Sequence, residues 1–400
     1  MKAIKVIRWI LGLVLSCVMW LFLWRWIYED GHDIFDLSWL LVYSYLLLVS
    51  QIVIHEAGHA LFGKMTGYKM TSFRVLSFMW SWYPDGRIVF QKSPVAGLSG
   101  QCLMAPPEYR ENKWPFRWYL SGGCLANLIA SLLALIFFER TWYLSIFSFM
   151  GFLIVLLNGL PDGHNDGKNI LLASQRKEYR YLLHLELKMN DLSNRGMTLA
   201  EMPRKYFEKI PTGSKRTHLD DYHDLLRVYF FLDTKQWEKL QSELDMLWEQ
   251  LPNVAPVYQL AVKAEMLFYL LIFQSNDPRI EEIWQDKKFR KMMRNEDSVT
   301  QRVKAAYLYS REKNLPEALD MLDSADNYLE KLPTRGRKKR EMQLIHWFQG
   351  LMIERGHPSH EIETVQPLSP VQALNADEEK NSLLLFILMM IGLVAIAYWL

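Results

Sequence analysis

The stretch that decides the fold is residues 38–63, which read SWLLVYSYLLLVSQIVIHEAGHALFG. The run is apolar and, as a helix, long enough to cross the hydrocarbon core of a bilayer. Three ionisable side chains stand near its end, those of His55, Glu56 and His59. Such groups are expensive to keep inside a membrane, so a function is the default explanation for their presence.

The spacing of these three residues indicates a metal site. Residues four apart lie on one face of a helix, so His55 and His59 can direct ring nitrogens at the same ion. Glu56 lies on the adjoining face, where its carboxylate can take a proton from a water molecule on that ion. This His-Glu-x-x-His arrangement is typical of zinc hydrolases. A random chain of this length would hold the pattern only about one or two times in a hundred.

Composition bounds the class of protein. The chain has 400 residues, enough for about two or three domains, and its apolar runs gather in residues 1–172 and in the last 20. The net charge of +2 favours no nucleic-acid partner. The three cysteines, Cys17, Cys102 and Cys124, form no close pair or spaced set, so packing roles are favoured over a disulfide framework.

Hydropathy and loop charges predict four spans in residues 1–175, at about 9–27, 38–63, 116–138 and 142–160. Lysine and arginine precede the first span, whereas the loop after it is acidic and contains neither. The positive-inside rule therefore predicts a cytoplasmic N-terminus for a multi-pass protein of the cell membrane. We expect a bacterial protein, from the compact core and the lack of organelle signals.

Residues 70–114 do not read as a span and predict a small β-hairpin at the cytoplasmic membrane surface. Ser72–Trp82 and Arg87–Gln91 have strand patterns, and Pro84-Asp85-Gly86 is a turn signal. Gly97–Gln101 predicts a flexible loop. An exposed strand here could pair with an extended substrate, and a plain surface connector is the alternative.

The predicted topology brings polar groups of the third and fourth spans into the same cytoplasmic-side layer as the two histidines. Asn127 needs a partner in the membrane; it could bond a substrate or an oxyanion, or it could tie two helices together. The fourth span ends in NGLPDGHNDG, residues 158–167. An open catalytic zinc site needs a third protein ligand, and on chemistry alone the candidates are Asp162, His164 and Asp166.

Three pieces in this order resemble the site-2 proteases, which are intramembrane zinc metalloproteases. The first is His55–His59 within a span. The second is Gly123-Cys124-Leu125-Ala126-Asn127, similar to the family's Gly-Pro-x-Ala-Asn. The third is Asn158-x-x-Pro161 with Asp166-Gly167, similar to Asn-x-x-Pro-x-x-x-x-Asp-Gly. The resemblance covers roughly residues 38–175 and departs from the family at Cys124 and at Asp162-Gly163-His164.

The resemblance implies one Zn²⁺ per chain. The offset of eight residues from Asn158 to Asp166 is that of the family pattern, which favours Asp166 as the third ligand beside His55 and His59. The alternative ligands are Asp162 and His164.

The resemblance also implies a metalloendopeptidase with Glu56 as the general base. Its substrate would be a membrane protein or peptide with a locally unwound span, and membrane lipid would surround it. Asn127 and Asn158 are the candidates for holding the substrate or an oxyanion.

Residues 176–361 predict a cytoplasmic all-α domain. Leu219–Pro252 and Thr300–Pro333 are alike, since each has an aromatic-rich and then a leucine-rich helix pattern and ends in Leu-Pro. Their length of about 34 residues resembles tetratricopeptide-type repeats, which could bind a protein partner; an ordinary helical bundle is the alternative. The basic run Arg335–Arg340 predicts a solvated loop.

Two other stretches bear on membrane attachment. Gln259–Phe273 is apolar, but Lys263 and Glu265 interrupt it and the pattern predicts an amphipathic helix. A polar linker over 362–381 then leads to a predicted C-terminal transmembrane helix over 382–400.

The predicted fold class is a polytopic α-helical membrane protein. It combines a four-span metalloprotease core, a membrane-surface β-hairpin, an all-α soluble domain and a C-terminal transmembrane helix. A second hypothesis is a membrane-anchored binding or scaffold protein that acts through its helical repeats and has a non-catalytic metal site. An intact Glu56 argues against it, because a purely structural site needs no general base.

Overall fold

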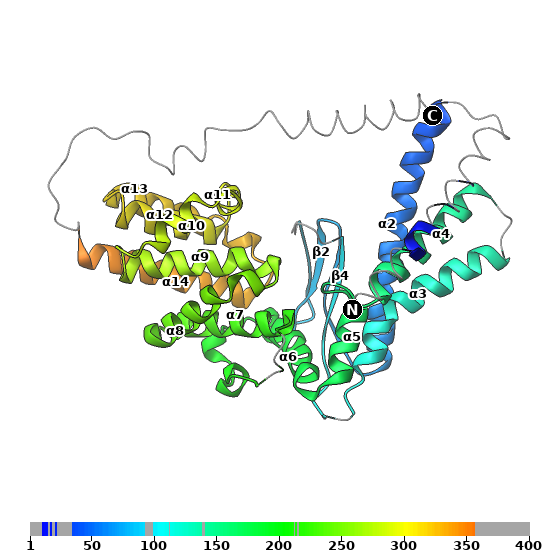
Figure 1. The fold of residues 1–400 in the computed structure, drawn as a ribbon, viewed down its shortest axis with the longest axis horizontal. Helices are drawn as coiled ribbons and strands as arrows, with labels where there is room; N and C mark the ends of the chain where they lie inside the picture. The colour runs from blue at the N-terminus through cyan, green and yellow to red at the C-terminus, as the bar shows by residue number, and fades with distance from the viewer. Residues whose placement is uncertain are drawn as a thin grey trace. The chain divides into compact units, whose positions relative to one another are not determined.

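The computed structural model describes residues 10–14, 17, 21, 34–92, 99–111, 113–137, 141–211, 213 and 216–356. Most of the predicted first span lies outside these residues, as do the predicted linker over 362–381 and the predicted C-terminal helix over 382–400. The described chain is mostly helical and has one small antiparallel sheet (Figure 1).

The chain divides into two compact units, of residues 1–258 with 330–340 and of residues 259–329 with 341–400. The first unit thus includes residues on both sides of the predicted boundary at residue 175. The predicted domain boundaries stay a prediction.

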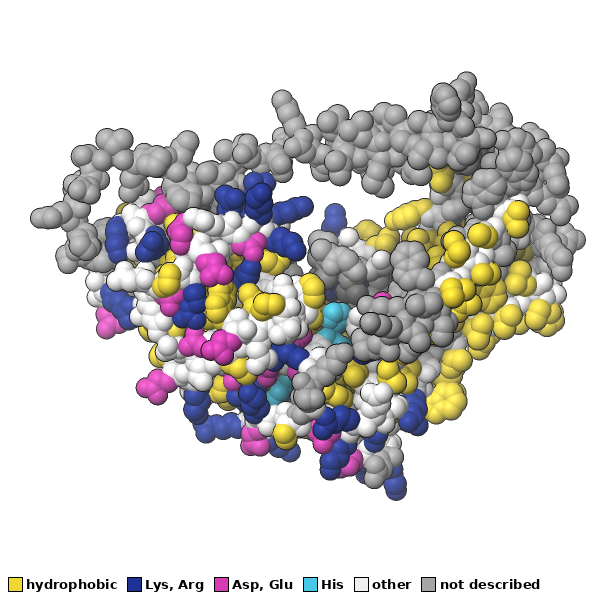
Figure 2. Space-filling view, in the orientation of Figure 1, with side chains coloured by type: hydrophobic (Ala, Val, Ile, Leu, Met, Phe, Trp, Pro, Cys, Tyr) yellow, Lys and Arg dark blue, Asp and Glu magenta, His cyan; other side chains and the backbone are white. Residues whose placement is uncertain are grey.

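Three predicted spans are helices with nearly the predicted ends: α2 (Ile34–Met65), α3 (Phe116–Phe137) and α4 (Trp142–Gly159). Within the described residues, these three and α9 (Pro256–Phe273) are long and apolar enough to cross a membrane. Figure 2 shows apolar side chains gathered over α2–α4. Exposed side chains there include Trp39, Leu46, Leu61, Ile129, Leu133 and Phe137, which is the surface that lipid would cover.

Helix α9 owes its apolar composition to a different environment. Its most apolar stretch is 56% buried, against 17–33% for the other three helices. Glu265 on α9 pairs with the fully buried Arg302 at 3.0 Å, and Arg302 also pairs with Glu341 at 2.6 Å. The sequence predicted an amphipathic helix over Gln259–Phe273; the helix forms, and its buried Glu265 is paired with Arg302.

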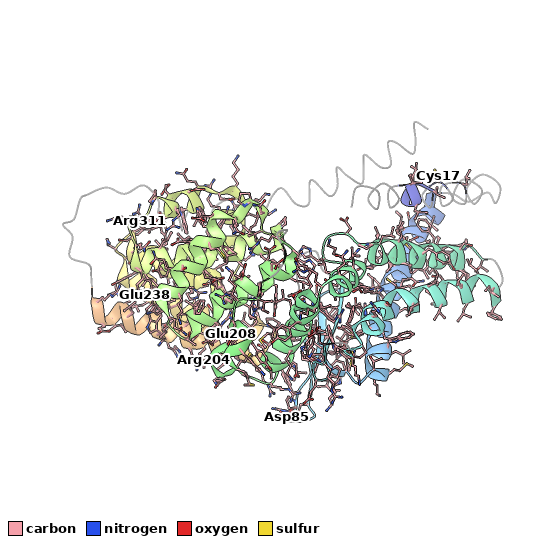
Figure 3. The ribbon with its side chains drawn as sticks, turned by 60° about the horizontal axis from the view of Figure 1, so that its bottom comes forward. Cys17, Asp85, Arg204, Glu208, Glu238 and Arg311 are labelled. Carbon is pink, nitrogen blue, oxygen red and sulfur yellow. The ribbon has the colours of Figure 1, made fainter. Side chains whose placement is uncertain are left out.

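The sheet has four strands, so the predicted two-stranded hairpin was too small. The strands are β1 (Lys69–Val75), β2 (Phe78–Trp82), β3 (Ile88–Lys92) and β4 (Gly100–Ala105), in the antiparallel order β3-β2-β1-β4. The predicted strand Ser72–Trp82 breaks at Leu76, which has a φ of 53° and no glycine, proline or asparagine beside it. Gly100 and Gln101, predicted as loop, begin β4. The predicted turn between β2 and β3 is confirmed, with Asp85 at its tip (Figure 3).

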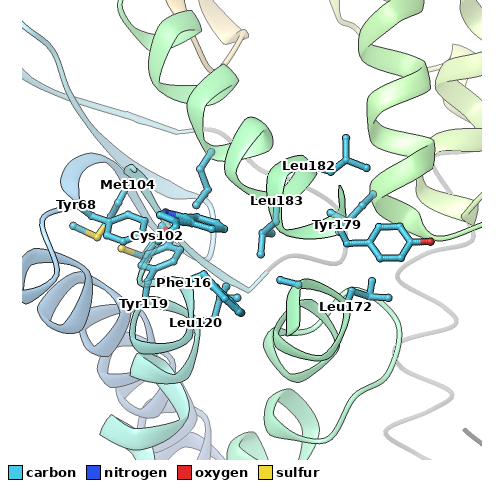
Figure 4. Packing of buried hydrophobic residues seen from close by; sticks show 14 residues of the cluster. Tyr68, Cys102, Met104, Phe116, Tyr119, Leu120, Leu172, Tyr179, Leu182 and Leu183 are labelled. Carbon is cyan, nitrogen blue, oxygen red and sulfur yellow. The ribbon is translucent and has the colours of Figure 1, made fainter. Parts of the chain in front are cut away.

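One apolar core joins the sheet to the helices around the site. Tyr68, Cys102 and Met104 pack with α3 residues and with two further helices, α5 (Asp166–Gln175) and α6 (Lys177–Asn194). Figure 4 shows this cluster, whose other members include Phe116, Tyr119, Leu120, Leu172, Tyr179, Leu182 and Leu183. The β4 strand and the start of α3 are therefore held in register by the same packed side chains.

The two predicted repeats are helix pairs. The first is α7 (His218–Asp233) with α8 (Trp237–Glu249), and the second is α12 (Ser298–Ser310) with α13 (Leu315–Asp326). Each pair turns through a lysine in the left-handed region, Lys235 and Lys313, both at φ 55°. Because a non-glycine residue seldom adopts this conformation, the shared turn supports a common repeat. The tetratricopeptide type itself stays a prediction.

The remaining elements are short, apart from the last helix. They are η1 (Leu199–Glu201), η2 (Arg204–Phe207), η3 (Leu251–Asn253), α10 (Arg279–Gln285), α11 (Lys287–Met293), η4 (Leu329–Lys331) and α14 (Arg335–Arg355).

The basic run Arg335–Arg340 was predicted to be a solvated loop. This prediction is wrong, because the run forms the start of α14. Lysine and arginine are good helix formers. Contacts also balance their charge: Lys339 pairs with Glu201 at 2.5 Å, and the Arg340 guanidinium lies 4.3 Å from the centre of the Tyr229 ring.

Candidate metal centre

Three potential ligand atoms meet at one point of the first unit. His55 Nε2 lies 3.2 Å from His59 Nε2, and Asp166 Oδ2 lies 3.2 Å from the former and 3.3 Å from the latter. A tetrahedral zinc ion with bonds of about 2.0–2.1 Å separates its ligand atoms by roughly 3.3–3.4 Å. The three residues are therefore spaced to hold one metal ion.

The hydrogen bonds of the two rings place the proton of each neutral imidazole on Nδ1. The Nε2 atoms, which face Asp166, then carry no proton. His55 Nδ1 lies 2.7 Å from Asn127 Oδ1, and His59 Nδ1 lies 2.7 Å from the backbone oxygen of Tyr119. Both partners are acceptors, so each Nδ1 must donate and each Nε2 of a neutral ring carries a lone pair. Two lone pairs and a carboxylate oxygen then face one another, and a cation between them satisfies all three.

The Asn127 amide is oriented by Gln51 on α2. Its Nδ2 donates to the backbone oxygen of Gln51 at 2.8 Å and to Gln51 Oε1 at 2.6 Å, which turns Oδ1 towards His55. Gln51 Nε2 in turn donates to the backbone oxygen of Phe147 on α4 at 2.9 Å. Of the two predicted roles of Asn127, these bonds describe the one that ties helices together. Its predicted contact with substrate stays a prediction.

Sequence reasoning missed Gln51, although one signal was present. A fully buried glutamine one turn before His55, within a membrane-length helix, needs partners and is therefore a candidate functional residue.

Asp166 reaches the histidines because Asn165 fixes the turn between α4 and α5. Asn165 Nδ2 donates to the backbone oxygens of Leu157 and Leu160, each at 2.6 Å. Its Oδ1 accepts the backbone N–H of Lys168 at 2.9 Å, as an N-cap does. Asn165 was also missed by the sequence analysis, although an asparagine directly before a helix is a cap signal.

The charge of Asp166 suits a metal ligand. Burial raises the pKa of this carboxyl, but positive charge on protonated rings of His59 and His55 more than offsets the effect and holds the pKa well below its usual range. A metal ion between neutral rings would place positive charge at the same point and favour the anion in the same way. The carboxyl is therefore an anion at neutral pH.

Glycines make room for the site between α2 and α3. A Cβ on Gly122 would lie 2.6 Å from the backbone oxygen of Gly58, so the helices approach at these two residues. A Cβ on Gly123 would lie 2.5 Å from His59 Nε2 and 2.6 Å from His55 Nε2. The space beside both nitrogens is thus open only because residue 123 has no side chain.

Glu56 borders a cavity of about 330 Å³ next to this centre. The cavity is lined by Leu48, Ile52, His55, Glu56, Ser99, Gly100, Ile154 and Asn158. The carboxylate lies against strand β4, since a Cβ on Gly100 would lie 2.5 Å from Glu56 Oε1. The volume lies within the range of small ligand pockets, so part of a peptide chain can enter beside Glu56 and His55.

The other predicted site residues lie in two places. Asn158 lines the cavity beside Glu56, and its Nδ2 donates to the backbone oxygen of Ile154 at 3.3 Å. Asp162 and His164 line a different cavity of about 680 Å³, where the His164 ring lies 4.7 Å from that of His218. Among the described residues, the group that can hold a metal contains neither of them.

Comparisons with protein-family models, with curated proteins and with solved structures found no match to this chain. The function must therefore be inferred from the residues of the site.

The ligand set predicts which carboxylate the metal needs. Purified protein should hold one zinc ion per chain, and Asp166→Ala should lower zinc affinity by more than about a hundredfold, because a direct ligand is lost. Asp162→Ala is the matched control and should keep its zinc. Elemental analysis with chelator competition measures both; loss of zinc in Asp162→Ala with retention in Asp166→Ala would contradict the assignment.

The hydrogen bond from His55 predicts a second effect on metal binding. Asn127→Leu keeps the size of the side chain but removes the acceptor of His55 Nδ1, so zinc affinity should fall by about 10–100-fold. Ser131→Ala, one turn further along α3, removes only a 3.4 Å hydrogen bond from Gln51 and should leave the affinity unchanged. Equal affinities in the two variants would show that Asn127 does not position His55.

Proposed function

We propose that this protein is an intramembrane zinc endopeptidase that cleaves a membrane-embedded protein or peptide. The observation that carries the proposal is the triangle formed by His55, His59 and Asp166, with Glu56 beside the adjoining cavity. A metal centre with three protein ligands leaves a fourth position for water or substrate, which is the arrangement of catalytic rather than structural zinc.

The residues of the site divide the work of amide hydrolysis. Zinc, when bound, polarises the substrate carbonyl and makes water more nucleophilic. The Glu56 carboxylate accepts the proton of the attacking water and passes it to the nitrogen of the leaving amine. Asn127 and Tyr119 hold the rings of His55 and His59 through their Nδ1 atoms. Asn158, on the wall of the cavity, is the candidate contact for the substrate backbone.

The membrane setting is part of the proposal. Helices α2, α3 and α4 would cross a bacterial cell membrane, with the metal centre near its cytoplasmic side and the helical region in the cytoplasm. A substrate helix must unwind locally before cleavage, since its amides are otherwise closed by internal hydrogen bonds. The three motifs that resemble site-2 proteases support membership of that family, which we propose on them and on the site geometry.

A membrane-anchored binding protein is the second candidate. The shared left-handed turns at Lys235 and Lys313 favour it, because repeated helix pairs are typical of proteins that bind protein partners. In that case the metal site would be non-catalytic, and Glu56 would have no role as a base.

The two candidates differ in what Glu56→Gln does. As an endopeptidase, the variant should keep its zinc and lose cleavage by at least about 10²–10⁴-fold, since the amide cannot accept the proton. Mass spectrometry of membrane peptides, from cells with either the wild-type or the variant protein, measures this loss. Identical peptide patterns together with an unchanged phenotype would reject the endopeptidase and favour the binding protein.

A further inference from the structure

Tyr119 contacts both the proposed metal ligand His59 and the strand β4, which borders the cavity beside Glu56. Its backbone oxygen accepts the Nδ1–H of the ligand His59 at 2.7 Å. Its hydroxyl donates to the backbone oxygen of Cys102 on β4 at 2.6 Å. The side chain is 4% exposed and lies in the apolar cluster of Figure 4, so a hydroxyl in this position needs the partner that it has.

The strand that Tyr119 holds is the one that lies against Glu56. The Tyr119 hydroxyl donates to the backbone oxygen of Cys102, and two residues earlier on β4 a Cβ on Gly100 would lie 2.5 Å from Glu56 Oε1. Gly100 and Glu56 also line the same cavity. The position of β4 therefore limits where the Glu56 carboxylate can lie.

We propose that Tyr119 is a positioning residue for Glu56: its hydroxyl holds β4 in the place where the strand lies against the carboxylate and limits its orientation. The inference rests on the proposed function, in which Glu56 is the general base. A general base must lie within about 2.6–3.2 Å of the atom that carries the proton it takes, so a strand that shifts by a fraction of this distance slows the proton transfer. The bond from His59 uses the backbone of Tyr119, so the two roles of this residue can be separated by substitution.

Tyr119→Phe removes the hydroxyl and leaves the backbone oxygen for His59. We expect zinc affinity to stay within about twofold of wild type. With labelled casein in detergent as the substrate, kcat should fall by about ten- to a hundredfold at nearly unchanged KM, because the base is displaced and not the binding surface. Acetohydroxamate chelates zinc and shares its proton with a neighbouring carboxylate, so its affinity should fall by about three- to tenfold without any turnover being needed.

Tyr68→Phe is the matched control. The rings of Tyr68 and Tyr119 stack at 4.7 Å in the same cluster, but the Tyr68 hydroxyl lies near the Trp114 indole and not on the β4 backbone. This variant loses the same atom from the same core and should behave like wild type in all three measurements. It separates a general loss of packing from a displaced Glu56.

The outcomes separate this inference from the proposed function. Wild-type values of kcat and acetohydroxamate affinity in Tyr119→Phe would overturn the positioning role, and so would a loss of zinc, which would place the effect on His59. Weaker acetohydroxamate binding in Tyr119→Phe but not in Tyr68→Phe would support the positioning role, even if wild-type protein does not cleave casein. Failure of the wild-type protein to cleave casein would count only against the proposed endopeptidase. Wild-type protein without zinc would overturn both.

Discussion

Three electron-rich atoms from distant parts of the chain meet across little more than 3 Å, and the rest of the first unit is arranged around this contact. His55 Nε2, His59 Nε2 and Asp166 Oδ2 lie 3.2–3.3 Å apart. The outer nitrogens of both rings already donate to fixed acceptors, so protons alone cannot satisfy the three atoms while the rings are neutral. A metal ion is the simplest partner for such a group, and its binding energy would repay the cost of burying it.

Each part of this contact is held by a different element. Helix α3 provides Asn127 and the backbone of Tyr119, and the glycines of α2 and α3 allow the close approach that these short hydrogen bonds require. The Asn165 side chain joins the end of α4 to the start of α5 and so carries Asp166 to the histidines. The sheet contributes through β4, whose Gly100 lies against the Glu56 carboxylate. The β4 strand is therefore part of the site as well as one wall of its cavity.

The sequence predicted the parts that depend on spacing within one element. The ends of α2, α3 and α4 followed from apolar runs, and the pairing of His55 with His59 followed from the helical period. Partners far apart in the chain were not predictable in the same way. Gln51 and Asn127 are separated by 76 residues, and no local pattern links them.

The sheet and the last helix failed for local reasons. Four strands were read as two because Leu76 makes a left-handed turn without glycine, asparagine or proline, so hydropathy continued through it. The basic run at the start of α14 was predicted to be a loop because a run of charges is usually solvated. In the structure Lys339 pairs with Glu201, and the Arg340 guanidinium lies over the Tyr229 ring. The turn at Leu76 therefore left little signal in the sequence, whereas contacts with distant residues outweighed the local signal of the basic run.

X-ray absorption at the zinc edge of the purified protein tests the central claim most directly. The account predicts one zinc ion with only nitrogen and oxygen neighbours at about 2.0–2.1 Å, including the outer-shell scattering of two imidazoles. The chain also contains three cysteines, so a sulfur neighbour is the natural competitor. Sulfur at about 2.3 Å, a single imidazole, or protein that binds no zinc at neutral pH would contradict the account.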